Sequence, residues 1–310
     1  MKVGQDDPED SKRNFWADFG LLSVAIIWGV NMPIMKFALA RIDPYAFNAS
    51  RLLISAIVLA AIVQFQKAPI IDRSEGAKAV WYQWSMIAVF AFFSGFAYQV
   101  LFLVGIDNTS AGNTALIMSA IPMWTAIMAF LLLGERIKPY AWLGLLLALI
   151  GTSVVTLAVV PISTSDTSLK GNLIVAVAAL MWALGTVVSR PIMKTIQPLP
   201  LAFLGVALAV PFHFLIAIDS LPEISRFISD PWLAAALVYS GALSTGLAYY
   251  LWNYGIKVLG AAHTAIFQNL VPIFALFSAW LILSEVPMVI QLVGGGLIIG
   301  GVVIMRKQRG

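Results

Sequence analysis

The sequence contains no cysteine and few charged residues. Its 19 Lys and Arg and 15 Asp and Glu make up only 11% of 310 residues, whereas an ordinary soluble domain carries about 25%. So few charges cannot form the solvated shell of a water-soluble protein of this length, and most of the surface is therefore expected to face lipid. Because cysteine is absent, the chain has no disulfide, no thiolate nucleophile and no cysteine-ligated metal site.

Apolar residues are what the sequence has in abundance. They make up 60% of the chain, and the mean hydropathy is +0.90. A helix that spans a bilayer needs about 20 such residues in a row. We therefore expect an all-α integral membrane protein with ten transmembrane helices, formed by the apolar runs at 17–36, 45–66, 81–106, 111–134, 139–160, 171–191, 198–218, 231–256, 261–284 and 287–305.

A short polar segment divides the ten predicted helices into five and five. Residues 161–170 are rich in Ser and Thr and are the only stretch that resembles a linker. We expect a first unit at 17–160 and a second unit at 171–305. The remaining ends, 1–16 and 306–310, are polar tails.

The distribution of Lys and Arg predicts the orientation of the chain. With the N-terminus in the cytoplasm, fourteen of these residues lie inside, Arg51 lies near the outer end of the second helix, and only Lys36, Arg41, Lys170 and Arg226 lie outside. The positive-inside rule then places both tails in the cytoplasm. Because the basic residues are scattered over short loops rather than gathered on one face, nucleic acid is not an expected partner.

The two units repeat one another. Trp28 and Lys36, eight residues apart in the first helix, recur as Trp182 and Arg190 in the sixth. Further matches keep the same order at shifts of 151 and then 150 residues: Gly95 with Gly246, Ala97 with Ala248, Tyr98 with Tyr249, Pro122 with Pro272, Glu135 with Glu285, Gly144 with Gly294, and Gly151 with Gly301. Because each unit has an odd number of helices, the second must enter from the opposite side, which gives the inverted repeats typical of alternating-access transporters.

These repeated features carry a resemblance to a known family. The Trp-Gly of the first helix with a basic residue after it, and the thirteen-residue step from Pro122 to Glu135, resemble the drug/metabolite transporter superfamily. Within it, the chain resembles the EamA-type ten-helix exporters over residues 17–305, and it is most similar to the bacterial aromatic amino acid exporters. The second unit departs from the pattern at two positions. Ala183 stands in place of the glycine and Arg190 in place of the lysine, which roughly keeps the size and the charge.

The resemblance implies a fold, an activity and a location. The fold is a basket of helices around a central cavity, lined mainly by helices 1, 3, 4, 6, 8 and 9, with helices 5 and 10 outside. The activity is export of amino acids from the cytoplasm, and the location is the bacterial inner membrane. No cofactor is expected, and the expected partners are a small-molecule substrate and the lipid bilayer.

Polar and aromatic residues inside the predicted helices are the candidates for substrate binding. A polar side chain in mid-membrane is costly unless it faces a partner or water. Together these side chains could supply donors for a carboxylate, acceptors for an ammonium group and an aromatic wall. The alternative, that each only packs or bonds neighbouring helices, stays open for Trp28, Asn31, Tyr98, Gln99, Ser119, Trp182, Tyr249, Asn253, His263, Gln268 and Asn269.

Proline and glycine mark two further features. Pro122 and Pro272 interrupt helices 4 and 9 and are predicted gating hinges, with a static bend as the alternative. Glu135 and Glu285 sit at helix ends and are interpreted as anchors.

A set of glycines predicts close helix contacts, or alternatively the face of a homodimer: Gly144, Gly151, Gly294, Gly296, Gly300 and Gly301. Whether the protein is a monomer or a homodimer stays open.

The missing charges narrow the function. No Asp or Glu falls in the middle of any predicted helix, which removes the usual proton-coupling carboxylate and the usual counter-ion for a cationic drug. No central pair of cations is present for a phosphate ester. We therefore predict a transporter that exports aromatic and other neutral amino acids by alternating access as an uncoupled uniporter. The alternative is an exporter of another small neutral metabolite or drug, with or without proton coupling.

An enzyme or a channel is disfavoured. The chain has only two histidines, His213 and His263, and contains neither a His-Glu-x-x-His nor a Gly-x-Ser-x-Gly motif. It has its own two-fold repeat and minimal loops, where a channel is expected to show an oligomeric pore filter.

Overall fold

The computed structural model describes residues 8–65, 76–108, 117–118, 120–135, 138–157, 166–283 and 288–306. Over these ranges every regular element is a helix. Seven helical segments are long and apolar enough to cross a membrane, and three shorter apolar helices lie at Ile121–Leu133, Trp142–Val154 and Val289–Ile304. The all-α membrane fold is thus confirmed, while the count of ten crossings stays a prediction.

The first half of the chain contains seven described helical elements. They are α1 (Pro8–Leu39), α2 (Pro44–Val63), α3 (Ala77–Phe90), the π-helix η1 (Ala91–Ala97), α4 (Tyr98–Asp107), α6 (Ile121–Leu133) and α7 (Pro139–Leu157). Elements α3, η1 and α4 form one continuous segment. Local sequence explains the ends: the Asp43 side chain accepts hydrogen bonds from the first amides of α2, and Gly134, with φ of 67°, ends α6.

The second half follows the same plan. Its elements are α8 (Asp166–Ile192), α9 (Pro198–Ile216), the 3-10 helix η2 (Ile218–Ser225), α10 (Arg226–Ser229), α11 (Pro231–Val238), the π-helix η3 (Tyr239–Leu247), α12 (Ala248–Leu259), α13 (Ala261–Ile266), the 3-10 helix η4 (Phe267–Leu270), α14 (Val271–Leu283) and α15 (Val289–Arg306). Asp230 caps α11 in the way that Asp43 caps α2, each just before a proline.

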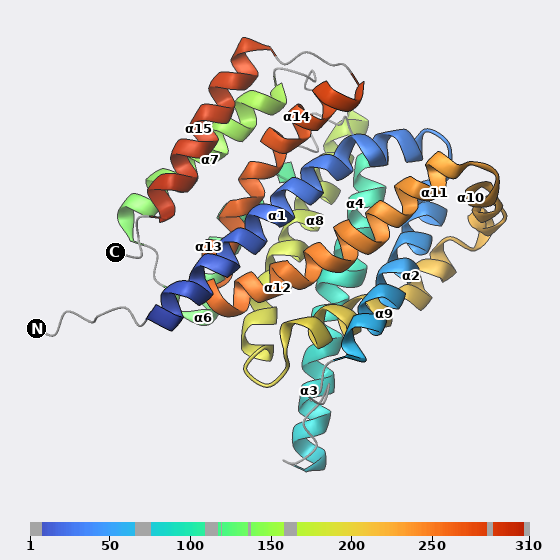
Figure 1. Ribbon diagram of the computed structural model, residues 1–310, viewed down its shortest axis with the longest axis horizontal. Coiled ribbons are helices and arrows are strands. Elements are labelled where there is room, and N and C mark those ends of the chain that lie inside the picture. The colour runs from blue at the N-terminus through green and yellow to red at the C-terminus, as the bar shows by residue number, and fades with distance from the viewer. Residues whose placement is uncertain are drawn as a thin grey trace, which may run out of the picture.

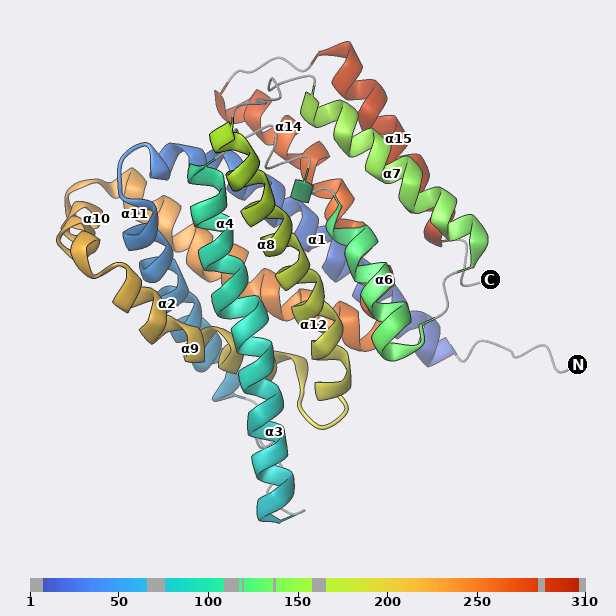
Figure 2. The ribbon, with the colours of Figure 1, turned by 180° about the vertical axis from the view of Figure 1, so that it is seen from behind.

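The two halves pack by exchanging their first helices. Helix α1 packs against α12 and α14 of the second half, and α8 packs against α4 and α6 of the first half. Helices α2 and α9 pair with each other, as do α7 and α15. Figure 1 shows the α7–α15 pair on one side of the bundle and the α2–α9 pair on the other, and Figure 2 shows the same arrangement from behind. The core therefore forms between the halves.

The α7–α15 contact is made by the glycines that the sequence singled out. A Cβ atom on Gly301 would lie 2.4 Å from the Gly144 carbonyl oxygen, and one on Gly151 would lie 2.5 Å from that of Gly294. The close helix contact predicted for these four residues lies within one chain. By contrast, added Cβ atoms on Gly296 and Gly300 would meet nothing within 4 Å.

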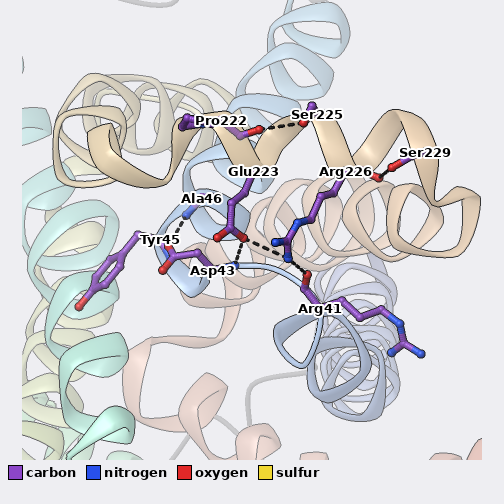
Figure 3. Close-up of polar contacts among 9 residues, drawn as sticks. All are labelled: Arg41, Asp43, Tyr45, Ala46, Pro222, Glu223, Ser225, Arg226 and Ser229. Carbon is purple, nitrogen blue, oxygen red and sulfur yellow. Dashed lines mark hydrogen bonds and ion pairs between the residues drawn. The ribbon is translucent and has the colours of Figure 1, made fainter.

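A polar clasp joins the halves at the end of the bundle where α1 finishes (Figure 3). The Glu223 carboxylate accepts a hydrogen bond of 2.9 Å from the Asp43 amide and lies 3.4 Å from the Arg226 guanidinium. Arg226 also donates to the Arg41 carbonyl oxygen. The turn between α1 and α2 is thereby tied to the loop between α9 and α11. At the opposite end, the start of α1 and the end of α15 lie near each other in both views.

Candidate functional site

Five aromatic rings from four helices meet in the middle of the bundle, and we call them the central ring cluster. Trp28 on α1 lies 5.6 Å from Trp182 on α8 and 5.2 Å from Trp252 on α12, measured between ring centroids. Trp182 also lies 4.8 Å from Tyr98 on α4 and 6.0 Å from Tyr249 on α12. Both halves of the chain contribute to this cluster, as a site between two repeats requires.

The three indole N–H groups of the cluster differ in their partners. Trp28 donates a hydrogen bond of 2.9 Å to the Ser244 carbonyl oxygen in the π-helix η3. Trp182 and Trp252 are buried, and their indole nitrogens have no partner among the described residues. A buried polar group without a partner is rare and points to water or a ligand. Two donors in the cluster are thus available to a bound molecule.

Other buried polar atoms without described partners lie on neighbouring elements. Asn253 on α12 donates to the Tyr249 carbonyl oxygen, but its own side-chain oxygen has no partner. The side-chain oxygen of Gln268 on η4 and the side-chain nitrogen of Asn269, the next residue, also have no partner among the described residues. Amide groups of this kind can bind either a carboxylate or an ammonium group.

The structure brings four of the predicted site residues together. Trp28, Tyr98, Trp182 and Tyr249 are all members of the central ring cluster. Trp182 and Tyr249 are buried, and Trp28 and Tyr98 are half-buried. These are the residues at which the repeat pattern places an aromatic in both halves, at shifts of 154 and 151 residues.

The other predicted residues contact side chains outside the ring cluster. Asn31 accepts a hydrogen bond of 2.6 Å from Ser240, and Gln99 accepts one of 2.7 Å from Arg51. Asn269 and Thr152 lie 3.5 Å apart, and His263 lies 3.4 Å from the Asp18 carboxylate. These contacts join separate helices, as expected if such residues only bond neighbouring helices. Ser119 lies outside the described residues.

The two predicted hinges lie at breaks in the helices. Pro272 is the second residue of α14 and follows the 3-10 helix η4, so the ninth predicted span runs as α13, η4 and α14. Pro122 lies in the first turn of α6, where the missing N–H costs no helical hydrogen bond. A 3-10 stretch in mid-helix often marks a hinge. Movement at either proline stays a prediction.

Two π-helices lie at matching places in the two halves. Gly95 in η1 and Gly246 in η3 are repeat partners, and each π-helix directly precedes a tyrosine of the ring cluster, Tyr98 or Tyr249, by one or two residues. π-helices are frequent at functional sites. They could not be predicted from the sequence, because an apolar run has the same composition in an α-helix and in a π-helix.

An ion pair joins helix ends at the end of the bundle where α1 begins. Glu135, after α6, pairs with Arg190 near the end of α8. The same carboxylate lies 3.4 Å from the Ala261 amide and 3.5 Å from the Ala262 amide at the start of α13. Glu135 therefore links three helices from both halves, in agreement with its interpretation as an anchor. Its repeat partner, Glu285, lies outside the described residues.

Two residues of the site were missed by sequence reasoning. Trp252 has no aromatic repeat partner, because Leu101 stands at the matching position, so the symmetry did not select it. Arg51 was placed near the outer end of its helix, yet it is buried, with 8% exposure, and bonds Asn48 and Gln99. The signal for Arg51 was the presence of a charge inside an apolar run.

Comparison with known proteins agrees with this architecture. The chain belongs to the EamA-like transporter family, whose model matches residues 15–157 and 169–307. It is similar to the uncharacterised transporter YyaM of Bacillus subtilis, with 30% identity, covering 91% of this chain and 90% of that protein. It is also 26% identical to a protein of Streptantibioticus cattleyicolor named "Probable terminal-alkyne amino-acid exporter", with 94% of both chains covered.

A solved structure has the same fold. A crystal structure superposes with a TM-score of 0.76 over 94% of this chain and 98% of that chain, at 18% sequence identity. With the family match, this establishes the protein as a multi-pass membrane transporter of the EamA family, within the drug/metabolite transporter superfamily.

Proposed function

We propose that the protein exports amino acids, aromatic and other neutral ones, from the bacterial cytoplasm. The observation that carries the proposal is the central ring cluster, in which the buried indole N–H groups of Trp182 and Trp252 have no partner among the described residues. An aromatic wall with a few unpaired polar groups suits a solute that has an apolar side chain and a polar end.

A relative supports the substrate class. The Streptantibioticus cattleyicolor protein of 26% identity is named as an amino-acid exporter. The substrate in that protein's name carries a terminal alkyne, which is linear and apolar, so the comparison favours amino acids as a class more than aromatic ones in particular. The preference for aromatic side chains is proposed from the central ring cluster and not from this relative.

The transport cycle follows from the repeats. The first helix of each half packs on the other half, so a rocking of one half against the other would open the ring cluster to either side in turn. The Glu135–Arg190 pair and the Glu223–Arg226 clasp lie at opposite ends of the bundle, where each would close one side. We propose that substrate moves down its own gradient, since no Asp or Glu falls in the middle of any of the ten apolar runs to carry a proton.

Flux measurements in proteoliposomes test the proposal. We would measure uptake of labelled phenylalanine and leucine, with and without an imposed pH gradient, for the wild type, Tyr98→Ala and Asn269→Ala. Saturable uptake that is unchanged by the gradient and reduced in both variants is the expected result. No amino-acid uptake by a folded wild type would contradict the substrate class and favour another small neutral metabolite, and uptake that follows the gradient would contradict uniport.

A further inference from the structure

Arg51 is a buried cation that has no counter-ion among the described residues. It is the eighth residue of the 20-residue helix α2, so it lies about 10 Å from the start of that helix. Its exposure is 8%. Over the described part of the chain, the ion pairs join Arg190 to Glu135, Arg226 to Glu223 and His263 to Asp18, and none includes Arg51. An unpaired charge at this depth is costly and is a functional indication by itself.

The partners of the guanidinium in the described part of the chain are all neutral atoms. Its Nε donates a hydrogen bond of 2.8 Å to Asn48 Oδ1, and Nη2 donates one of 2.7 Å to Gln99 Oε1. Nη1 lies 3.9 Å from the Met35 sulfur, which is a weak acceptor. An arginine has five N–H donors, so two remain. The group is held in place by its neighbours without being neutralised.

A second layer of hydrogen bonds fixes the position of Asn48. Its side-chain nitrogen lies 3.1 Å from His213 Nδ1, and His213 Nε2 lies 2.9 Å from the Gly95 carbonyl oxygen in η1. Because a carbonyl can only accept, Nε2 carries the hydrogen. Nδ1 then accepts from the Asn48 amide, which leaves the Asn48 oxygen for Arg51. This chain of bonds contains no negative charge.

Two partners of the guanidinium lie on helices that carry rings of the central ring cluster. Gln99, which accepts from Arg51, directly follows Tyr98, and the Tyr98 ring lies 4.8 Å from Trp182. On the other side, Met35 lies seven residues, or two helical turns, after Trp28 on α1. The charge on α2 thus reaches between the two helices, α1 and α4, that carry rings of the cluster.

We propose that Arg51 binds the carboxylate of the transported solute, while the central ring cluster contacts its side chain. The proposal rests on the proposed function and adds the group that recognises the acid end of the substrate. Arg51 supplies the two free donors and the positive charge, a combination that suits a carboxylate. The Asn48–His213 chain and Gln99 act as positioning residues. A solute with an amide or a hydrogen in place of the carboxylate loses this contact.

The test compares solutes with and without the carboxylate. Phenylalanine, phenylalaninamide and phenethylamine would compete against labelled phenylalanine in proteoliposomes. In the wild type, phenylalanine is expected to compete about tenfold better than the other two, the effect of one charged hydrogen-bonded contact. In Arg51→Gln this preference falls to about one, and Arg51→Lys, which keeps the charge but not the fork of donors, retains part of it.

A further variant separates binding from folding. Gln99→Glu has nearly the same shape and places a carboxylate next to Arg51, so the protein supplies its own anion. Its thermal unfolding midpoint is expected to be unchanged or higher, whereas its preference for phenylalanine over phenylalaninamide is lost. Arg41→Gln is the matched control, because Arg41 is exposed and, within the described ranges, its side chain contacts the Phe37 carbonyl oxygen and ring. It removes the same charge and keeps the preference.

The outcomes distinguish this proposal from the proposed function. Suppose that folded Arg51→Gln transports amino acids with an unchanged preference for phenylalanine over phenylalaninamide. That result overturns the role of Arg51 and leaves the proposed function standing. If Arg51→Gln does not fold, the same result in folded Gln99→Glu decides the question. If the wild type transports no amino acid, the proposed function fails, and carboxylate binding by Arg51 is then tested by ligand-induced stabilisation. Benzoate, but not benzamide, should then raise the unfolding midpoint of the wild type and not that of Gln99→Glu. Equal effects of both compounds, or on both proteins, overturn the proposal.

Discussion

At the scale of single residues, the tryptophans of the central ring cluster allow binding and packing to be separated. Trp28 donates its indole N–H to the Ser244 carbonyl oxygen, and Trp182 donates to no described residue. Replacing either by Phe keeps an aromatic ring and removes an N–H. We expect Trp28→Phe to lower the free energy of unfolding by about 1 kcal/mol more than Trp182→Phe, because only Trp28 loses a hydrogen bond.

Transport should be affected more by Trp182→Phe than by Trp28→Phe. If the Trp182 N–H binds the solute, Trp182→Phe raises the KM for phenylalanine by about 2–10-fold, the effect of one hydrogen bond. The comparison needs thermal or denaturant unfolding in detergent and uptake kinetics on the same preparations. An equal KM in wild type and Trp182→Phe, with the stability difference present, would show that the unpaired N–H plays no part in binding.

Residue identity could be predicted from sequence where a residue is repeated, and not where its role depends on packing. Trp28, Trp182, Tyr98 and Tyr249 were selected because a bulky aromatic in mid-helix recurs in both halves. The partners of Asn31, Gln99 and His263 lie 209, 48 and 245 residues away in the chain. Such contacts depend on how the helices are placed, which the residue pattern of one helix does not encode.

At the scale of elements, the α7–α15 pair gives a stability test with an internal control. Gly300 and Gly301 are neighbours on α15, but an added Cβ would meet Gly144 and Ala148 only at position 301. We expect Gly301→Ala to destabilise the protein by about 1–3 kcal/mol, as overpacking does. Gly300→Ala should stabilise it by about 0.5–1 kcal/mol, because glycine weakens a helix interior.

Thermal unfolding of the two purified variants measures the difference. Equal midpoints for Gly300→Ala and Gly301→Ala would contradict the close α7–α15 contact. Chemical cross-linking of the same samples also addresses the homodimer interpretation, since an added Cβ on Gly296 or Gly300 of α15 would meet nothing within 4 Å. Loss of a cross-linked dimer in Gly300→Ala would support a dimer face there.

The existence of elements was easier to predict than their internal form. The apolar runs at 45–66, 198–218 and 231–256 predicted helices. In the structure α2, α9 and α11 begin at Pro44, Pro198 and Pro231, since proline is favoured in the first turn. The change from α to π geometry at Ala91 and Tyr239 had no signal in the sequence. Within η1, Gly95 packs closely against α9, since an added Cβ would lie 2.5 Å from the Gly205 carbonyl oxygen.

At the scale of the whole molecule, the orientation in the membrane can be measured with little interference, since the chain has no cysteine. Ser229, the last residue of α10, and Thr195, between α8 and α9, are exposed. The positive-inside rule places Ser229 outside and Thr195 inside the cell. A membrane-impermeant maleimide should therefore label Ser229→Cys in intact cells, and Thr195→Cys only after permeabilisation. The reverse pattern would contradict cytoplasmic termini.

The division into two repeats was the part of the whole molecule that the sequence predicted best. Matches such as Pro122 with Pro272 are visible along the chain, and the family model matches both halves. The exchange of first helices, in which α1 packs on α12 and α14 and α8 packs on α4 and α6, could not be predicted. All these helices are apolar on most sides, so their pattern does not specify which neighbour each one takes.

Counterflow of phenylalanine in proteoliposomes tests most directly that the protein is an amino-acid carrier working by alternating access. Vesicles loaded with unlabelled phenylalanine would be diluted into a trace of labelled phenylalanine. We predict that the label accumulates transiently inside, and that loading with leucine, but not with an unrelated sugar, has the same effect. Label that enters at the same rate whatever the vesicles contain, or that does not enter at all, would contradict such a carrier.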